Sequence, residues 1–95
     1  MTTATVYHEI APRFGMGAPA PFDAKHYRPV ATLQTSDLGE VFRLTNSIDA
    51  PWYSSREVRS LVGPARSTSV GDIVVLTDES GQRAYRCAMV GWEPV

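Results

Sequence analysis

Four segments of this chain have the hydrophobic pattern of β-strands: three alternate hydrophobic and polar residues, which buries one face, and one is a short apolar run. These segments are 2–10, 27–35, 73–77 and 83–90. The third begins with Ile-Val-Val-Leu and is apolar on both faces, so we expect it to lie at the centre of the sheet. Together the four segments predict a small, mostly antiparallel sheet.

The finer pattern predicts faces, turns and strand ends. Strict alternation along the second strand places Tyr27, Ala31 and Leu33 on the same face. Residues 78–81, Asp-Glu-Ser-Gly, form the predicted loop of the last hairpin, with the glycine at a position of positive φ. Proline has no amide proton for a sheet ladder, so we expect Pro94 to end the pairing of the last strand.

One segment, 36–46, has the period of an amphipathic α-helix. Asp37, or Ser36 before it, can accept hydrogen bonds from the first amides of the helix and thereby cap it. Asn46 tolerates the left-handed conformation and is the predicted C-terminal cap. The predicted buried stripe consists of Leu38, Val41, Phe42 and Thr45.

The order of the predicted elements is strand, strand, helix, strand, strand. Segments 11–22 and 47–64 contain several prolines and glycines and are predicted to be irregular. This order indicates a single α+β domain over residues 1–95, in which the helix packs on the sheet. A partly open barrel with the helix as a plug satisfies the same pattern.

Composition and charge limit the possible classes of function. The net charge is −1, so the chain has no general electrostatic attraction to nucleic acid. Cys87 is the only cysteine, which excludes an internal disulfide and fits a reducing compartment. The N-terminal residues lack the pattern of a signal peptide, and no segment is long and apolar enough to span a bilayer. We therefore expect a cytoplasmic protein without a membrane partner.

Candidate catalytic groups are few. Cys87 with His8 or His26 could in principle form a nucleophile and its base. Cys87 lies among apolar strand residues, where cysteines are usually inert, and His8 alternates with apolar residues of the first strand. The three residues do not have the spacing of a metal site. We expect no enzyme activity, no metal and no cofactor.

Candidate binding residues lie in two segments. Arg66, Ser67, Thr68 and Ser69 precede a tight turn, where the guanidinium and the hydroxyls either bind an anion or satisfy their own backbone. We expect Asp72 to cap this turn through its side chain. The second segment has two aromatic residues and an arginine that could form contacts, although aromatic residues can also close the core. These residues are Trp52, Tyr53 and Arg56.

Three blocks of the chain resemble the YodL-like group of small domains from bacterial mobile elements and phage. The first is 27–31 before the helix, the second is 66–74, and the third is 85–87 together with 90–95, which contains a Gly-aromatic pair. The resemblance implies a mobile-element context and no mechanism. Val-Gly-Asp-Ile-Val at 70–74 also resembles the strand entry of PUA and ASCH RNA-binding barrels.

These observations predict a small non-enzymatic module that binds another protein and that, on a mobile element, could modulate a host system. Its contact surface would be the turn 66–69 with the aromatic segment at 52–56. The alternative is a nucleic-acid-binding barrel, which requires its arginines to converge on one face. Those arginines are Arg28, Arg43, Arg83 and Arg86, which would act together with Arg66 of the turn. A homodimer is also predicted as an option, through the edges of the strands at 2–10 and 27–35.

Overall fold

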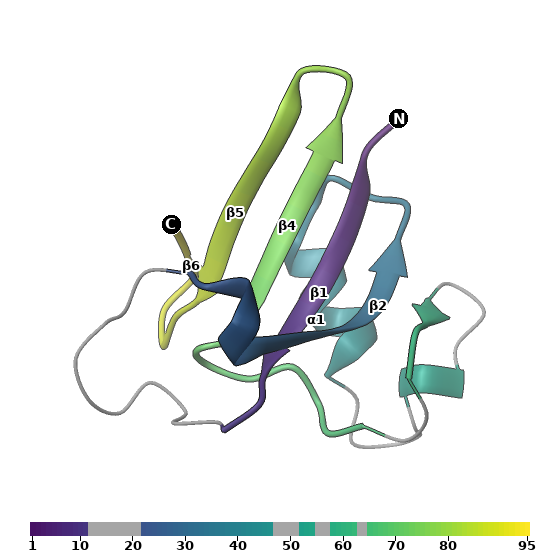
Figure 1. The fold of residues 1–95 in the computed structure, drawn as a ribbon. Helices are drawn as coiled ribbons and strands as arrows, with labels where there is room; N and C mark the ends of the chain where they lie inside the picture. Colours follow the sequence, from purple (N-terminus) through teal and green to yellow (C-terminus); the bar gives the residue numbers. More distant parts are fainter. Residues whose placement is uncertain (12–21, 47–51, 55–57, 63–64) are drawn as a thin grey trace.

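The described part of the chain forms one antiparallel sheet with a single α-helix on one of its faces (Figure 1). The computed structural model describes residues 1–11, 22–46, 52–54, 58–62 and 65–95. Its six strands are β1 (Thr3–Glu9), β2 (Tyr27–Leu33), β3 (Arg59–Ser60), β4 (Ile73–Asp78), β5 (Gly81–Cys87) and β6 (Trp92–Pro94). The helices are α1 (Leu38–Thr45) and two short 3-10 helices, η1 (Ala24–His26) and η2 (Trp52–Ser54).

The strands lie in the order β3-β2-β1-β4-β5-β6, and every neighbouring pair is antiparallel. The predicted antiparallel sheet with one α-helix is confirmed for the described residues. β4 is central and its first four residues are buried, as the apolar run predicts. Two expectations are wrong. There are six strands rather than four among the described residues, and the sheet is open rather than barrel-like because β3 and β6 occupy opposite edges. β1 lies between β2 and β4, so it has no free edge for a dimer.

The last strand differs from its predicted form. β5 ends at Cys87 rather than at residue 90, because the chain turns back over 88–91 with Gly91 at φ 72°. Pro94 is the last residue of β6 and the last paired position of this ladder, opposite Tyr85, as predicted. Two cross-strand bonds, one on each side of the β5–β6 ladder, run from Ala88 N–H to Gly91 O and from Val95 N–H to Ala84 O. Because bonded positions alternate, Pro94 occupies a position that needs no amide proton.

A β-bulge explains why the predicted face of the second strand is wrong. The register between β1 and β2 shifts between Val6 and Tyr7, which leaves Val30 as an additional residue in β2. A bulge changes the side to which the following residues point. Ala31 therefore packs into the cluster under α1, whereas Tyr27 packs into a second cluster on the other face.

Helix α1 begins where its cap predicts. The Asp37 carboxylate accepts hydrogen bonds from the amides of Gly39 and Glu40, at 2.9 and 3.2 Å. Asn46 is the C-terminal cap, but its φ of −135° is not left-handed. The observed stripe of the helix differs from the predicted buried stripe at one residue. Phe42 is exposed at the edge of the stripe, where its ring contacts that of Trp92. On the face toward the core, Val41 and Thr45 are buried, and Leu38 and Leu44 are partly buried.

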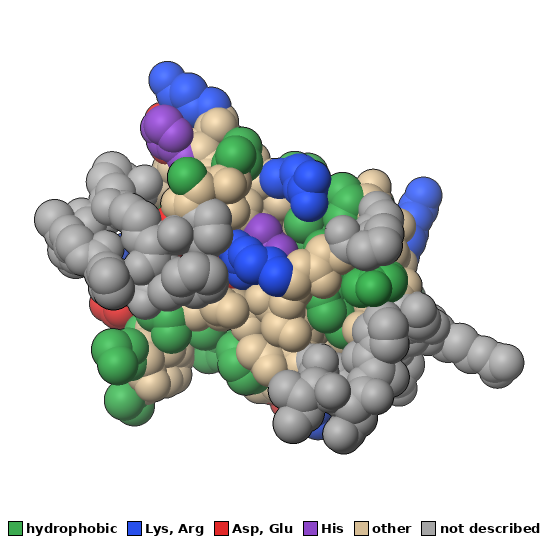
Figure 2. Space-filling view, turned by 90° about the horizontal axis from the view of Figure 1, so that it is seen from below, with side chains coloured by type: hydrophobic (Ala, Val, Ile, Leu, Met, Phe, Trp, Pro, Cys, Tyr) green, Lys and Arg blue, Asp and Glu red, His purple; other side chains and the backbone are tan. Residues whose placement is uncertain are grey.

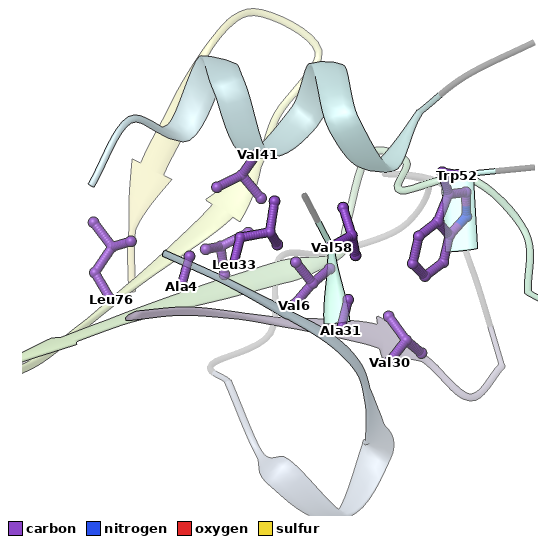
Figure 3. Packing of buried hydrophobic residues seen from close by; sticks show 10 residues of the cluster. Ala4, Val6, Val30, Ala31, Leu33, Val41, Trp52, Val58 and Leu76 are labelled. Atoms are coloured by element: carbon purple, nitrogen blue, oxygen red, sulfur yellow. The ribbon is translucent and has the colours of Figure 1, made fainter. Parts of the chain in front are cut away.

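The core lies between α1 and the sheet. Figure 3 shows Val41 pointing from the helix toward Leu33 and Ala4 of the sheet, while Trp52 lies at the other end of the cluster and Val58 lies between them. The opposite face of the sheet has a smaller cluster around Tyr27, Ile73 and Val75, with η1 in front of the sheet (Figure 1). The hairpin between β4 and β5 is as predicted, with Gly81 at φ 127°.

Candidate functional site

The turn at 66–72 is held by an ion pair between Arg66 and Asp72. The two guanidinium nitrogens Nη1 and Nη2 contact the carboxylate oxygens Oδ2 and Oδ1 at 2.6 and 2.7 Å, which is the bidentate geometry. The Asp72 side chain is 1% exposed and that of Arg66 is 29% exposed. The hydrogen bond to Asp72 raises the pKa of Arg66 above its usual range. The turn is therefore closed by a charge pair that is mostly shielded from water.

Both partners of this pair also bind the backbone. Asp72 accepts the amide protons of Ser69 and Glu9, at 2.8 and 2.9 Å, which confirms that its side chain caps the turn. Arg66 donates to the carbonyl oxygens of Ser67 and Glu9, at 3.0 and 3.4 Å. Because Glu9 is the last residue of β1, the pair fastens the turn to the end of the sheet. We call the Arg66–Asp72 pair the clamp.

A line of buried polar side chains runs from the clamp to the helix. Thr45 Oγ1 donates to the carbonyl oxygen of Val41 at 2.8 Å, and Thr68 Oγ1 donates to Thr45 Oγ1 at 2.7 Å. Each hydroxyl has a single proton, so Thr68 can only accept from Nε2 of His8, which lies 3.1 Å away. His8 is thus the tautomer with its hydrogen on Nε2, and Nε2 also lies 3.9 Å from Oδ2 of Asp72.

The surroundings of His8 keep its imidazole neutral. Burial, together with the positive charges of Arg66 and Arg28, lowers the pKa of His8 to about 4. The negative charge of Asp72 opposes this effect without cancelling it. The ring packs edge-on against Trp52, with the centroids 6.1 Å apart. A base with a pKa this low and with Nε2 committed to Thr68 is a structural group at neutral pH.

The residues predicted as a contact surface are brought together, but they differ in exposure. Thr68 is fully buried, and Ser67 and Ser69 are half-buried. Trp52 is 3% exposed rather than a surface contact, and its Nε1–H donates to the carbonyl oxygen of Arg66 at 2.9 Å. Tyr53 is half-buried and packs on Trp52. Arg56 lies outside the described residues.

Two of the four arginines of the nucleic-acid alternative pair with acidic residues at separate places. Arg43 pairs with Glu40 one turn earlier on α1. Arg83 pairs with Asp78 across the β4–β5 hairpin, 2.8 Å away. These two side chains therefore occupy the helix surface and the hairpin, away from the clamp.

The other two arginines lie on opposite faces of the sheet. Arg28 is exposed and lies opposite His8 in the register, on the side of the sheet that α1 covers. Arg86 lies opposite Ile73, whose side chain belongs to the cluster on the other side. Figure 2 shows the end of the molecule from below, where basic side chains reach the surface at separate positions. The four arginines do not form one continuous surface.

The remaining candidate groups for chemistry are the Cys87 thiol and the possible metal ligands. Cys87 is buried, and burial raises the pKa of its thiol to about 11, with the charge of Asp72 acting in the same direction. Among the described residues, no three His, Cys, Asp or Glu side chains are close enough together to hold a metal ion. Within the same part of the chain, no helix has the length and hydrophobicity to cross a membrane.

Sequence reasoning did not identify three members of the polar line as one group. These three residues are His8 in β1, Thr45 in α1 and Asp72 in the turn 66–72, and the sequence pattern gives each of them a separate role. His8 and Thr68 are separated by 60 residues, so no local spacing could connect them. The available signal was a polar residue at an otherwise buried strand or helix position, since such groups need a partner.

The fold and this polar line are the basis for functional inference, because no family model, curated protein or solved structure matches the chain.

Proposed function

We propose that this chain is a small non-enzymatic module that binds another protein at the end of the sheet formed by the turn 66–72. The support comes from the hydrogen-bond partners of the polar groups at this end of the sheet. The Asp72 carboxylate, Nε2 of His8 and the Thr68 hydroxyl are all committed to internal hydrogen bonds. An active site needs such groups to face a substrate. Here they fix the shape of a surface instead.

A protein partner fits this surface better than a nucleic acid does. Nucleic-acid affinity depends on several cations that follow a phosphate backbone. The net charge of −1 and the dispersed arginines give no such path. A shaped turn with half-buried hydroxyls and an adjacent tyrosine suits a protein surface, where hydrogen bonds and aromatic contacts are made over a small area.

The biological setting is part of the same proposal. The resemblance to YodL-like domains suggests a gene on a mobile element, and a cytoplasmic binding module from such an element could modulate a host system. A homodimer is a further option. Its interface could not use the edge of β1, because β1 lies inside the sheet.

The test is capture of proteins from a cytoplasmic lysate by the tagged chain, with and without nuclease, read by mass spectrometry. Arg66 and Trp52 are unsuitable positions for variants because both stabilise the fold. Ser67 is better, since its side chain is half-buried and a tyrosine there adds bulk to the turn. Ser67→Tyr is compared with Ser36→Tyr, which adds the same bulk to an exposed serine just before the cap of α1.

We expect a protein that survives nuclease treatment and that is lost with Ser67→Tyr but kept with Ser36→Tyr. Circular dichroism of both variants controls for loss of fold. Capture that disappears with nuclease would mean that the chain binds nucleic acid rather than a protein. Equal capture by both variants would place the contact elsewhere on the molecule, and no nuclease-resistant capture at all would contradict protein binding.

A further inference from the structure

The turn between β5 and β6 carries two large apolar side chains almost entirely in water. Met89 is 87% exposed and Val90 is 92% exposed. A single exposed apolar residue is ordinary on a protein surface. Two adjacent ones at the tip of a turn form a protruding apolar knob, and we call Met89 and Val90 the tip. In Figure 1 this turn lies at the lower end of the sheet, beyond β5.

The tip is held by backbone hydrogen bonds. The Ala88 amide donates to the carbonyl oxygen of Gly91 at 3.0 Å, and Gly91 adopts a φ of 72° that other residues rarely accept. A turn closed in this way presents its two central side chains in a fixed direction. Little backbone conformational entropy is then lost when the turn enters a partner.

The base of the tip is joined to the turn at 66–72. Gly71 N–H donates to the Cys87 carbonyl oxygen at 2.9 Å, and Cys87 N–H donates to the Asp72 carbonyl oxygen at 2.8 Å. Asp72 in turn is fixed by Arg66 through the clamp. The tip is therefore continuous with the surface of the proposed function and is braced by the same ion pair.

The charge around the tip favours one class of partner. Residues 88–92 contain no ionisable side chain, and the nearest charged residues along the chain are the half-buried Arg86 and the exposed Glu93. Insertion of an apolar turn into an anionic membrane normally relies on several nearby basic residues. A convex, uncharged knob is complementary to a concave apolar pocket on a protein.

We propose that Met89 and Val90 are the apolar anchor of the protein contact and that the partner is a protein with an apolar pocket that receives them. This inference rests on the proposed function and adds the chemical class of the partner's surface. The turn 66–72 then contributes the polar rim around this anchor, in keeping with the usual anatomy of protein interfaces.

The first test uses the nuclease-resistant protein recovered in the capture experiment as its probe. The variant Met89→Ser with Val90→Ser is compared with Leu61→Ser, which removes a 44% exposed leucine that follows β3 at the other sheet edge. Loss of a buried apolar anchor from an interface weakens binding about thirtyfold or more. We expect that loss for the tip variant, no loss for Leu61→Ser, and an unchanged thermal transition for the tip variant.

The second test locates the contact directly. A photoreactive benzoylphenylalanine replaces Met89 in one preparation and Leu61 in another, and the probe protein is cross-linked by light. We expect cross-links from position 89 to apolar residues of the partner and none from position 61. The fragment masses then identify the pocket residues.

Several results would overturn the inference. Full binding by the tip variant together with loss of binding by Ser67→Tyr would reject the anchor and leave the proposed function intact. Concentration-dependent dimers in sedimentation that the tip variant abolishes would assign the tip to a second copy of this chain. Binding to vesicles of phosphatidylcholine and phosphatidylserine that the tip variant abolishes would assign it to a membrane.

Discussion

Removal of the guanidinium from the clamp should destabilise the fold more than any other single arginine substitution in the described residues. In Arg66→Leu, the Asp72 carboxylate keeps the amide protons of Ser69 and Glu9 but loses two charged hydrogen bonds of 2.6 and 2.7 Å. A buried charge left without its partner costs about 3–5 kcal/mol. Because the Arg66 side chain is 29% exposed, water can replace part of the interaction. We therefore expect a loss of about 3 kcal/mol.

The measurement is urea denaturation at pH 7 followed by circular dichroism. The variant should lower the unfolding midpoint without changing the slope, since the surface exposed on unfolding is the same. A loss of this size is a large part of the roughly 5–15 kcal/mol that stabilises a typical domain. Arg43→Leu is the matched control, because it breaks an ion pair with Glu40 on the exposed face of α1 and should cost much less.

A double-mutant cycle with Asp72→Asn separates the pair from other effects of each substitution. Asparagine keeps a carbonyl acceptor and removes the charge, so the double variant should be more stable than the sum of the two single losses predicts. We expect a coupling energy of about 2 kcal/mol. A coupling near zero, or equal losses for Arg66→Leu and Arg43→Leu, would show that the clamp does not hold the turn and would refute the reasoning.

Two further predictions concern buried titratable groups. Burial lowers the pKa of His8 from 6.5 to about 4, so the unfolded chain takes up a proton at a higher pH than the folded chain does. Stability is then complete above about pH 6.5 and falls as the pH approaches 4, by about 2 kcal/mol between pH 7 and pH 5. This slope in denaturation curves should disappear in His8→Gln and remain in His26→Gln; a flat profile for the native chain would contradict it. Because burial raises the pKa of the Cys87 thiol to about 11, a disulfide reagent should label the unfolded chain at once and the folded chain slowly. Rapid labelling of the folded chain would mean that the thiol is accessible.

The elements that could be predicted from the sequence are those with a sustained period. The strands around residues 2–10 and 73–77 and the helix have enough residues for alternation or a helical stripe to appear. β3 and β6 have two and three residues, and so short a strand has no period. The bulge at Val30 escaped prediction for another reason, since it depends on the register that β1 imposes.

The candidate site was predicted only in part, for a physical reason. The polar run at 66–69 identified the turn, and the spacing of Asp72 identified its cap. The sequence could not show that the guanidinium of Arg66 turns back to Asp72 rather than outward, because both directions are open to a flexible side chain. Trp52 was ambiguous in the same way, and its burial follows from the position of the segment over the sheet.

The ends of the sheet have a consequence for how this protein behaves at high concentration. An open sheet offers unpaired backbone groups at its margins, and these can recruit strands from other molecules into aggregates. Here one margin is the two-residue β3, and the other is β6, in which Pro94 removes an amide from the outward side. Strands this short, one of them with a proline, offer little template for strand-by-strand growth. We therefore expect the short margins to slow edge-to-edge aggregation of the open sheet at high concentration.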